Sequence, residues 1–119
     1  VKLLLDFGYQ FPVLVSPHAV VSRHAQIGLG TTVGHGVIVN AGAVIGDHCI
    51  INTRALIEHD VHIGHQCHIS TGVLVNGGVS VGSGSFIGSG AMIREGLHLP
   101  PLTVIGAAKR VMGWPLRDQ

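Results

Sequence analysis

Aliphatic residues recur along this chain with a period of six. The residue two places before each aliphatic position is usually small or β-branched, as at Ala43, Val61 and Val73. Buried positions spaced two residues apart are typical of a short β-strand that faces a core. The pattern therefore predicts many short strands whose aliphatic side chains share one interior. The aliphatic positions are Val15, Val21, Ile27, Val33, Val39, Ile45, Ile51, Ile57, Ile63, Ile69, Val75, Val81, Ile87, Ile93, Leu99 and Ile105.

A repeat of six residues is too short for a strand and a helix, so each strand must be followed by a tight corner. Glycine adopts positive φ at little steric cost, and it occupies many predicted corners, including Gly36, Gly42, Gly72 and Gly78. Three strands and three corners complete one turn of a triangular prism, in which equivalent residues of successive turns stack about 4.8 Å apart. We expect an all-β parallel β-helix of about five coils.

The composition agrees with a repetitive β scaffold that forms one domain. The 119 residues include 18 glycines, and 46% are hydrophobic, 4% aromatic and 11% charged, whereas ordinary globular domains are about 25% charged. The β-helix is predicted to span residues 13–108, with a preceding segment at 1–12 and a tail at 109–119. The net charge of +1 argues against nucleic acid as a partner. Nothing resembles a signal peptide or a bilayer-spanning segment, so we expect no membrane association and a cytoplasmic location.

The residue before each aliphatic position should point outward. On one predicted face of the prism these outward residues form an apolar stripe. Monomeric soluble proteins rarely leave such a stripe exposed, so we expect another subunit to bury it, and a cyclic homotrimer suits a three-sided prism. The active sites would then lie between subunits. The stripe consists of Val20, Ile38, Leu56, Leu74 and Met92.

Among nine histidines, His59 has the strongest signal for chemistry. It lies between Glu58 and Asp60, and a neighbouring carboxylate fixes the tautomer that a histidine needs to act as a general base. Gly77 is its predicted neighbour one coil later, where a backbone N–H could hold an oxyanion. Most other histidines, including His18, His24, His48 and His98, are expected to be ordinary surface residues.

Residues 51–64 and 68–72 resemble the bacterial sugar acetyltransferases that N-acetylate nucleotide-linked amino sugars or O-acetylate sialic acid. The resemblance implies a left-handed β-helix, acetyl-CoA as co-substrate, no metal, and a sugar or nucleotide-sugar acceptor. It also implies that His59 is the general base, that Asp60 polarises it with Glu58 on its other side, and that His68 lies near the thioester. Gly77 would offer its N–H to the acetyl carbonyl.

The same resemblance implies that CoA runs from His68 towards Gly88, Gly106 and Lys109, and that Asn52 contacts the acceptor. Members of this family carry a small nucleotide-binding domain before the β-helix, and residues 6–12 look like only its closing segment. The family's Pro-Ala-Lys near the C-terminus is replaced by residues 107–109, Ala-Ala-Lys.

Other functions remain open at this point. The acceptor could be a hydroxyl of sialic acid rather than an amine. A γ-class carbonic anhydrase uses the same scaffold with three histidine ligands on a metal, but the His59, His62, His65 and His68 spacing differs from the His-x4-His of that class. A non-catalytic assembly module is a further alternative, although a purely structural coil would be expected to keep glycine at position 58.

Overall fold

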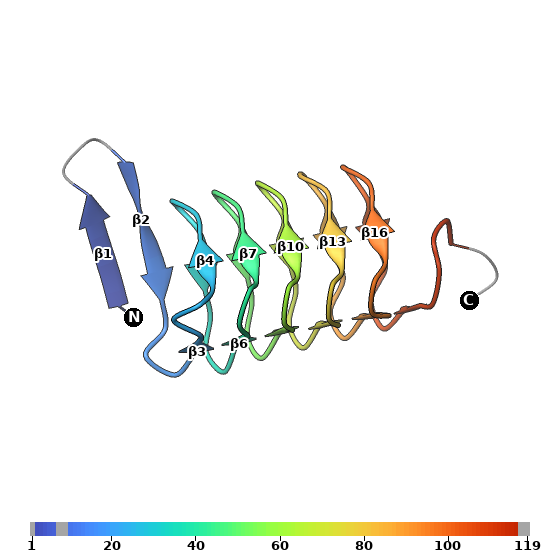
Figure 1. Ribbon diagram of the computed structural model, residues 1–119, viewed down its shortest axis with the longest axis horizontal. Helices are drawn as coiled ribbons and strands as arrows, with labels where there is room; N and C mark the ends of the chain where they lie inside the picture. The colour runs from blue at the N-terminus through green and yellow to red at the C-terminus, as the bar shows by residue number, and fades with distance from the viewer. Residues whose placement is uncertain (1, 7–9, 117–119) are drawn as a thin grey trace.

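The computed structural model describes the backbone of residues 2–6 and 10–116 and the side chains of residues 12–116, and every regular element in these ranges is a β-strand. The strands of the coils pair in parallel in three sheets, which are the three faces of an elongated prism with extents of 48 × 25 × 22 Å (Figure 1). No helix in the described ranges could cross a membrane. The predicted all-β parallel β-helix is confirmed.

Each face takes every third strand, which follows from three strands per coil. Face A consists of β2 (Gln10–Val15), β5 (Thr32–Val33), β8 (Ile50–Ile51), β11 (His68–Ile69), β14 (Phe86–Ile87) and β17 (Val104–Ile105). Face B consists of β3 (Val20–Val21), β6 (Ile38–Val39), β9 (Leu56–Ile57), β12 (Leu74–Val75), β15 (Met92–Ile93) and β18 (Arg110–Val111). Face C consists of β4 (Gln26–Ile27), β7 (Val44–Ile45), β10 (His62–Ile63), β13 (Ser80–Val81) and β16 (His98–Leu99).

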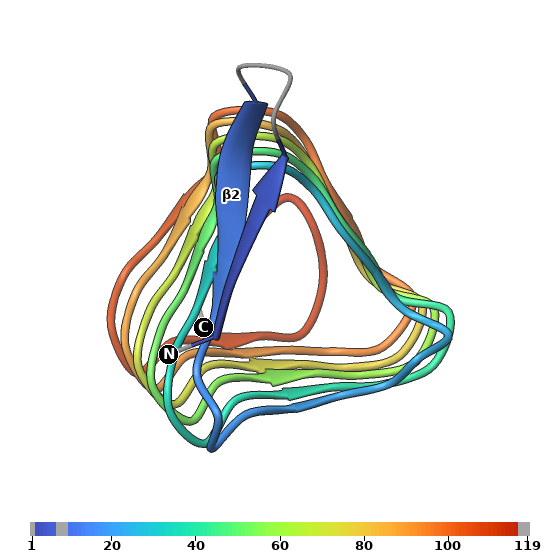
Figure 2. The same ribbon diagram turned by 90° about the vertical axis from the view of Figure 1, so that its left-hand side faces the viewer.

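The coils wind in the left-handed sense that the family resemblance implies. Seen from the N-terminal end in Figure 2, the chain passes along the lower face, then the right-hand face and then the left-hand face as it recedes. The register between neighbouring strands is 18 residues throughout the coils, as in the pairing of His62 with Ser80 and of Leu56 with Leu74. We name the corners after the faces they join, so that corner BC follows a strand of face B.

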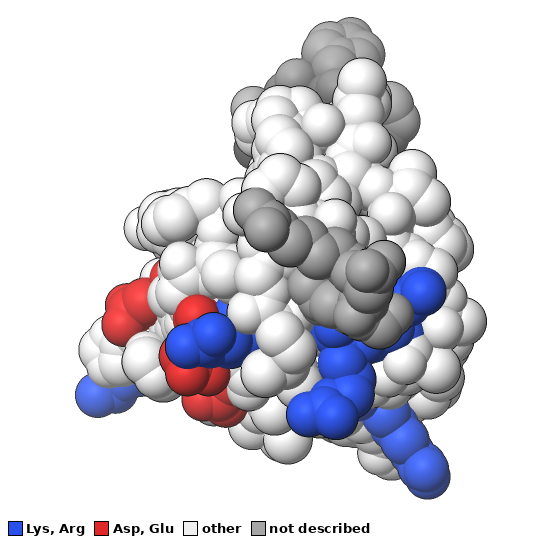
Figure 3. All heavy atoms as spheres, turned by 90° about the vertical axis from the view of Figure 1, so that its right-hand side faces the viewer, with Lys and Arg blue, Asp and Glu red and all other residues white. Residues whose placement is uncertain are grey.

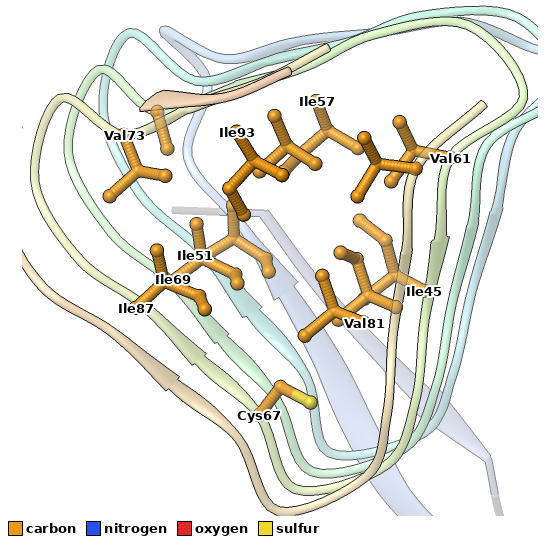
Figure 4. Packing of buried hydrophobic residues seen from close by; sticks show 14 of the residues in the cluster. Ile45, Ile51, Ile57, Val61, Cys67, Ile69, Val73, Val81, Ile87 and Ile93 are labelled. Carbon is orange, nitrogen blue, oxygen red and sulfur yellow. The ribbon is translucent and has the colours of Figure 1, made fainter. Parts of the chain in front are cut away.

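The repeated aliphatic residues fill the prism, as predicted. Ile51, Ile57 and Ile69 are fully buried, and Figure 4 shows such side chains stacked in columns that point towards the axis. Each buried aliphatic side chain of this size contributes roughly 1.5–3 kcal/mol, so the stacked columns are the main source of stability. Cys49 and Cys67 also face the core, as expected.

Two faces, rather than one, present apolar side chains to solvent. The stripe predicted on face B is present, with Val20, Ile38 and Leu74 exposed. Face A also exposes Ile50 and Phe86, which the sequence analysis did not predict. Face C carries polar or histidine side chains at most of its outward positions. Faces A and B are therefore the two surfaces suited to burial in an assembly.

Further strands continue the sheets at both ends of the prism. β1 (Lys2–Asp6) precedes the coils and pairs antiparallel with β2, so it extends the sheet of face A. At the other end, β18 pairs in parallel with β15, so the last coil continues past residue 108 to Val111.

From residue 30 to residue 108, every sixth residue lies in the middle of a corner and adopts positive φ. Glycine occupies this position at eight corners, among them Gly42 (φ 78°) and Gly96 (φ 77°). Other residue types occupy it at six corners, and four of these follow one another along the chain. A left-handed conformation is unfavourable for a residue with a Cβ, although Asp tolerates it better than most. The four consecutive residues are His48, Arg54, Asp60 and Gln66.

Candidate active site

Corner BC between β9 and β10 carries the predicted catalytic residues Glu58, His59 and Asp60. Nδ1 of His59 lies 3.2 Å from Oδ2 of Asp60. Because a carboxylate only accepts hydrogen bonds, this contact places the proton on Nδ1 and leaves the lone pair of Nε2 free. A histidine in this tautomer can accept a proton from a substrate through Nε2.

The imidazole of His59 lies against Gly77 of the next coil, which agrees with the predicted stacking of these two residues. A Cβ on Gly77 would be only 2.6 Å from Nε2 and 2.7 Å from Cε1 of His59. Real Cβ atoms essentially never approach so closely, so glycine at position 77 provides the space in which the ring lies. The ring is thus held between the Asp60 carboxylate and the Gly77 backbone.

The backbone N–H of Gly77, the residue beside this ring, differs from the equivalent N–H groups at another corner. At corner CA the N–H groups of Leu29, Asp47 and His65 each donate to a side chain one coil later, over 2.8–2.9 Å. Gly77 occupies the same position of its own hexad, where Glu95 is the residue one coil later. Among the described residues no acceptor pairs with the Gly77 N–H. An amide in this state can stabilise a developing oxyanion.

Glu58 does not share the role of Asp60. Nδ2 of Asn40, one coil earlier, donates to Oε1 of Glu58 at 2.5 Å. Only Asp60, of the two carboxylates that flank His59, makes a hydrogen bond with the ring. Asn40 was not predicted as a site residue. Its position 18 residues before Glu58, in the same column, is the signal that could have identified it.

The residues predicted to bind CoA and acceptor lie elsewhere on the prism. Asn52, Gly88 and Gly106 share one column of corner AB, and a Cβ on Gly88 would be 2.8 Å from the carbonyl carbon of Gly106. Lys109 packs its side chain beside Gly106 at the C-terminal end of the prism, where Lys and Arg side chains gather (Figure 3). Oδ1 of Asn52 accepts a hydrogen bond from its neighbour's backbone N–H.

His68 lies on face A, which is opposite corner BC. Its ring meets the ring of Phe86 edge-on, with centroids 5.2 Å apart. Its Nε2 is buried and has no hydrogen-bond partner in the described part of the chain. His59 and His68 of one chain therefore cannot reach the same reacting group, because the filled core of the prism separates them.

The remaining histidines and the cysteines show no second catalytic arrangement. His62 lies on face C and His65 at corner CA, so the close histidine pairs do not converge, and the described residues contain no group of three metal-binding side chains. His98 lies on β16 rather than at a corner, and its Nδ1 is 2.7 Å from Oγ of Ser80.

The two cysteine thiols are buried in the core. Sγ of Cys49 lies 3.0 Å from the Gly64 carbonyl oxygen, and Sγ of Cys67 lies 3.2 Å from that of Gly82. The contact with Cys67, followed by burial, raises the pKa of the Cys49 thiol far above its usual range. The same contact lowers the pKa of the Cys67 thiol, but both side chains face the filled core, where a substrate does not reach them.

The described part of one chain does not enclose a substrate site. The His59 side chain is 63% exposed and that of Asp60 is 72% exposed. The described residues form no pocket. Because small-molecule sites are usually concave and largely desolvated, this corner needs a second surface to become one.

No family model and no curated protein matches the sequence. Among solved structures, the acetyltransferase domain of PglB from Neisseria gonorrhoeae is 38% identical, covers 85% of this chain and has a TM-score of 0.83. It has also been solved with acetyl coenzyme A. PerB from Caulobacter crescentus, in complex with CoA and GDP-perosamine, is 38% identical, covers 89% of this chain and has a TM-score of 0.84.

The chain spans about half the length of these similar proteins, 49% of the PglB domain chain and 53% of PerB. A hexapeptide-repeat acetyltransferase from Vibrio cholerae, at 20% identity and a TM-score of 0.71, shares the fold. The family resemblance predicted from residues 51–64 and 68–72 is confirmed by these similarities.

Proposed function

We propose that this chain, which belongs to the hexapeptide-repeat acetyltransferases, transfers the acetyl group of acetyl-CoA to the amine of a nucleotide-linked amino sugar. One observation carries the proposal: the His59 imidazole is held between the Asp60 carboxylate and Gly77, with Nε2 free to take a proton. The similarity to PerB, which binds CoA and GDP-perosamine, supports an amino-sugar nucleotide as acceptor. Use of acetyl-CoA supports a cytoplasmic location.

The reaction is a direct transfer within a complex of both substrates. The neutral amine nitrogen attacks the thioester carbonyl carbon while Nε2 of His59 takes up the proton that the nitrogen loses. The Gly77 N–H stabilises the negative charge that develops on the carbonyl oxygen. The C–S bond then breaks, and the imidazolium returns its proton to the CoA thiolate. No covalent enzyme intermediate is needed.

The assembly we propose is a cyclic homotrimer whose B faces surround the three-fold axis. The apolar residues of face B would then be buried, and corner BC of one subunit would meet corner AB and face A of the next. A face exposing Ile38 and Leu74 favours such burial, because solvent-exposed apolar patches of this kind are rarely left free.

This arrangement gives a role to the residues that lie away from His59. Corner AB and face A of the neighbouring subunit would form the second wall of the site and line the path of CoA. Asn52 would face the acceptor, and His68 would lie near the thioester. The exposed Phe86, which packs on His68, would form part of the apolar wall beside the pantetheine arm. The residues that line the proposed path of CoA are His68, Gly88, Gly106 and Lys109, and Asn52 lies on the acceptor side.

The proposal is tested by measuring release of free CoA thiol from acetyl-CoA with a panel of acceptors. We expect turnover with an amino-sugar nucleotide such as GDP-perosamine and none with the corresponding sugar that lacks the amine. Turnover with sialic acid instead would assign the alternative acceptor, a hydroxyl. Absence of turnover with every acceptor would contradict acetyl transfer by this chain.

A further inference from the structure

The carboxylate that orients His59 rests in a space that a single glycine leaves open. The Asp60 side chain folds back towards the preceding coil and lies over Gly42. A Cβ on Gly42 would overlap Oδ1 of Asp60 and lie 3.1 Å from its Cγ. The other carboxylate oxygen, Oδ2, faces Nδ1 of His59. One oxygen therefore occupies the space above Gly42 while the other holds the ring.

The backbone around this contact is fixed on both sides. The N–H of Asp60 donates to the Ala41 carbonyl at 3.1 Å, and the N–H of Gly42 donates to the His24 carbonyl at 3.0 Å. Asp60 has φ of 59°, which determines the direction in which its Cβ leaves the corner. With the backbone held in this way, the position of the carboxylate depends on whether the space above Gly42 is open.

We propose that Gly42 is a positioning residue for the acetyl transfer, because the absence of a Cβ leaves the space in which the Asp60 carboxylate lies when it orients His59. This inference rests on the proposed function of His59 as general base. Gly42 would touch neither substrate and would act only through the Asp60 carboxylate. An alanine at this position would push the carboxylate out of this space and away from Nδ1 of His59.

The chain offers a matched control for the backbone effect of such a substitution. Gly96 lies in the same column of corner BC and has φ of 77°, against 78° for Gly42. A Cβ on Gly96 would meet nothing within 4 Å. Alanine costs the same left-handed backbone strain at both positions. Only at position 42 does it also collide with a side chain.

The collision at position 42 can be relieved without unfolding the coil. The atom that a Cβ would meet is the end of the Asp60 side chain, which is 72% exposed and free to rotate into solvent. We therefore expect Gly42→Ala and Gly96→Ala to have similar melting temperatures. The two variants should differ in kcat instead.

The experiment measures kcat for CoA release with acetyl-CoA and GDP-perosamine in a double-mutant cycle. We expect Gly42→Ala to lower kcat by about tenfold or more, which is part of the loss expected on removing the general base itself. Gly96→Ala should keep kcat within about twofold of that of the unmodified protein. Asp60→Gly keeps the positive φ and removes the carboxylate. In that background Gly42→Ala should have no further effect, because there is no carboxylate left to displace.

A second readout does not depend on turnover. The ¹⁵N chemical shifts of the His59 ring report which nitrogen carries the proton, and we expect Nδ1–H in the unmodified protein and in Gly96→Ala. Gly42→Ala should lose this preference. If the tautomer changes but no acceptor is acetylated, the positioning role stands and the proposed function fails. If acetylation occurs while Gly42→Ala changes neither tautomer nor kcat, or acts additively with Asp60→Gly, the positioning role is wrong.

Discussion

The contact between His59 and Gly77 predicts the effect of adding one methyl group to the site. In Gly77→Ala the new Cβ would lie 2.6 Å from Nε2, so the ring must retreat by about 0.8 Å to restore an ordinary contact of 3.4 Å. A misplacement of about 1 Å costs on the order of 10²-fold in rate. Because alanine keeps the backbone N–H at position 77, the substitution displaces the base without removing the proposed oxyanion donor.

The assay is steady-state CoA release with acetyl-CoA and GDP-perosamine. We expect kcat to fall about 10²-fold in Gly77→Ala, while Tm changes by no more than roughly 2 °C because His59 is exposed and its ring can swing aside. The control is Gly77→Ala in a His59→Ala background, where the ring is absent and the added methyl should cost nothing more. If Gly77→Ala alone retains a kcat within about threefold of that of the unmodified protein, the contact with Gly77 does not constrain catalysis by His59.

His59→Ala should lower kcat by about 10²-fold or more and leave acetyl-CoA affinity nearly unchanged, as judged by titration, and unchanged turnover would end the assignment of the base. Leu74→Asp should convert the proposed trimer to monomers in light scattering, since it places a charge in the apolar stripe of face B, whereas Gln26→Asp on polar face C should not. His59→Ala and His68→Ala, if each is impaired alone, should regain activity when refolded together. Mixed trimers no more active than the separate variants would show that each site is built within one subunit.

The fold and the neighbours of His59 could be predicted because the chain repeats with a short, fixed period. A six-residue strand and corner place the aliphatic residues inside, and three such units per coil bring Gly77 beside His59. The same count places His68 half a coil from His59 and hence on the opposite side of the prism. These relations follow from spacing alone, since each coil contacts only the coils next to it.

Several features of the site could not be read from spacing. The period shows that Asp60 shares a column with both Gly42 and Gly78, but not towards which of them its carboxylate leans. Glu58 and Asp60 both neighbour His59 in the sequence. In the structure, however, Glu58 accepts a hydrogen bond from Asn40, and only Asp60 contacts the His59 ring. Side-chain direction depends on rotamers and on local space, which differ between coils with the same backbone.

By itself, the sequence determined the β-helix, its core, the stacking of His59 on Gly77 and the separation of His59 from His68, because all four depend only on a constant repeat. The tertiary structure decided which carboxylate contacts the His59 ring, that non-glycine residues such as Asp60 adopt positive φ, and that face A is apolar as well as face B. It also showed that one chain forms no pocket at this corner in its described part. Those outcomes depend on how individual side chains fill the space between neighbouring coils, which a regular backbone leaves open.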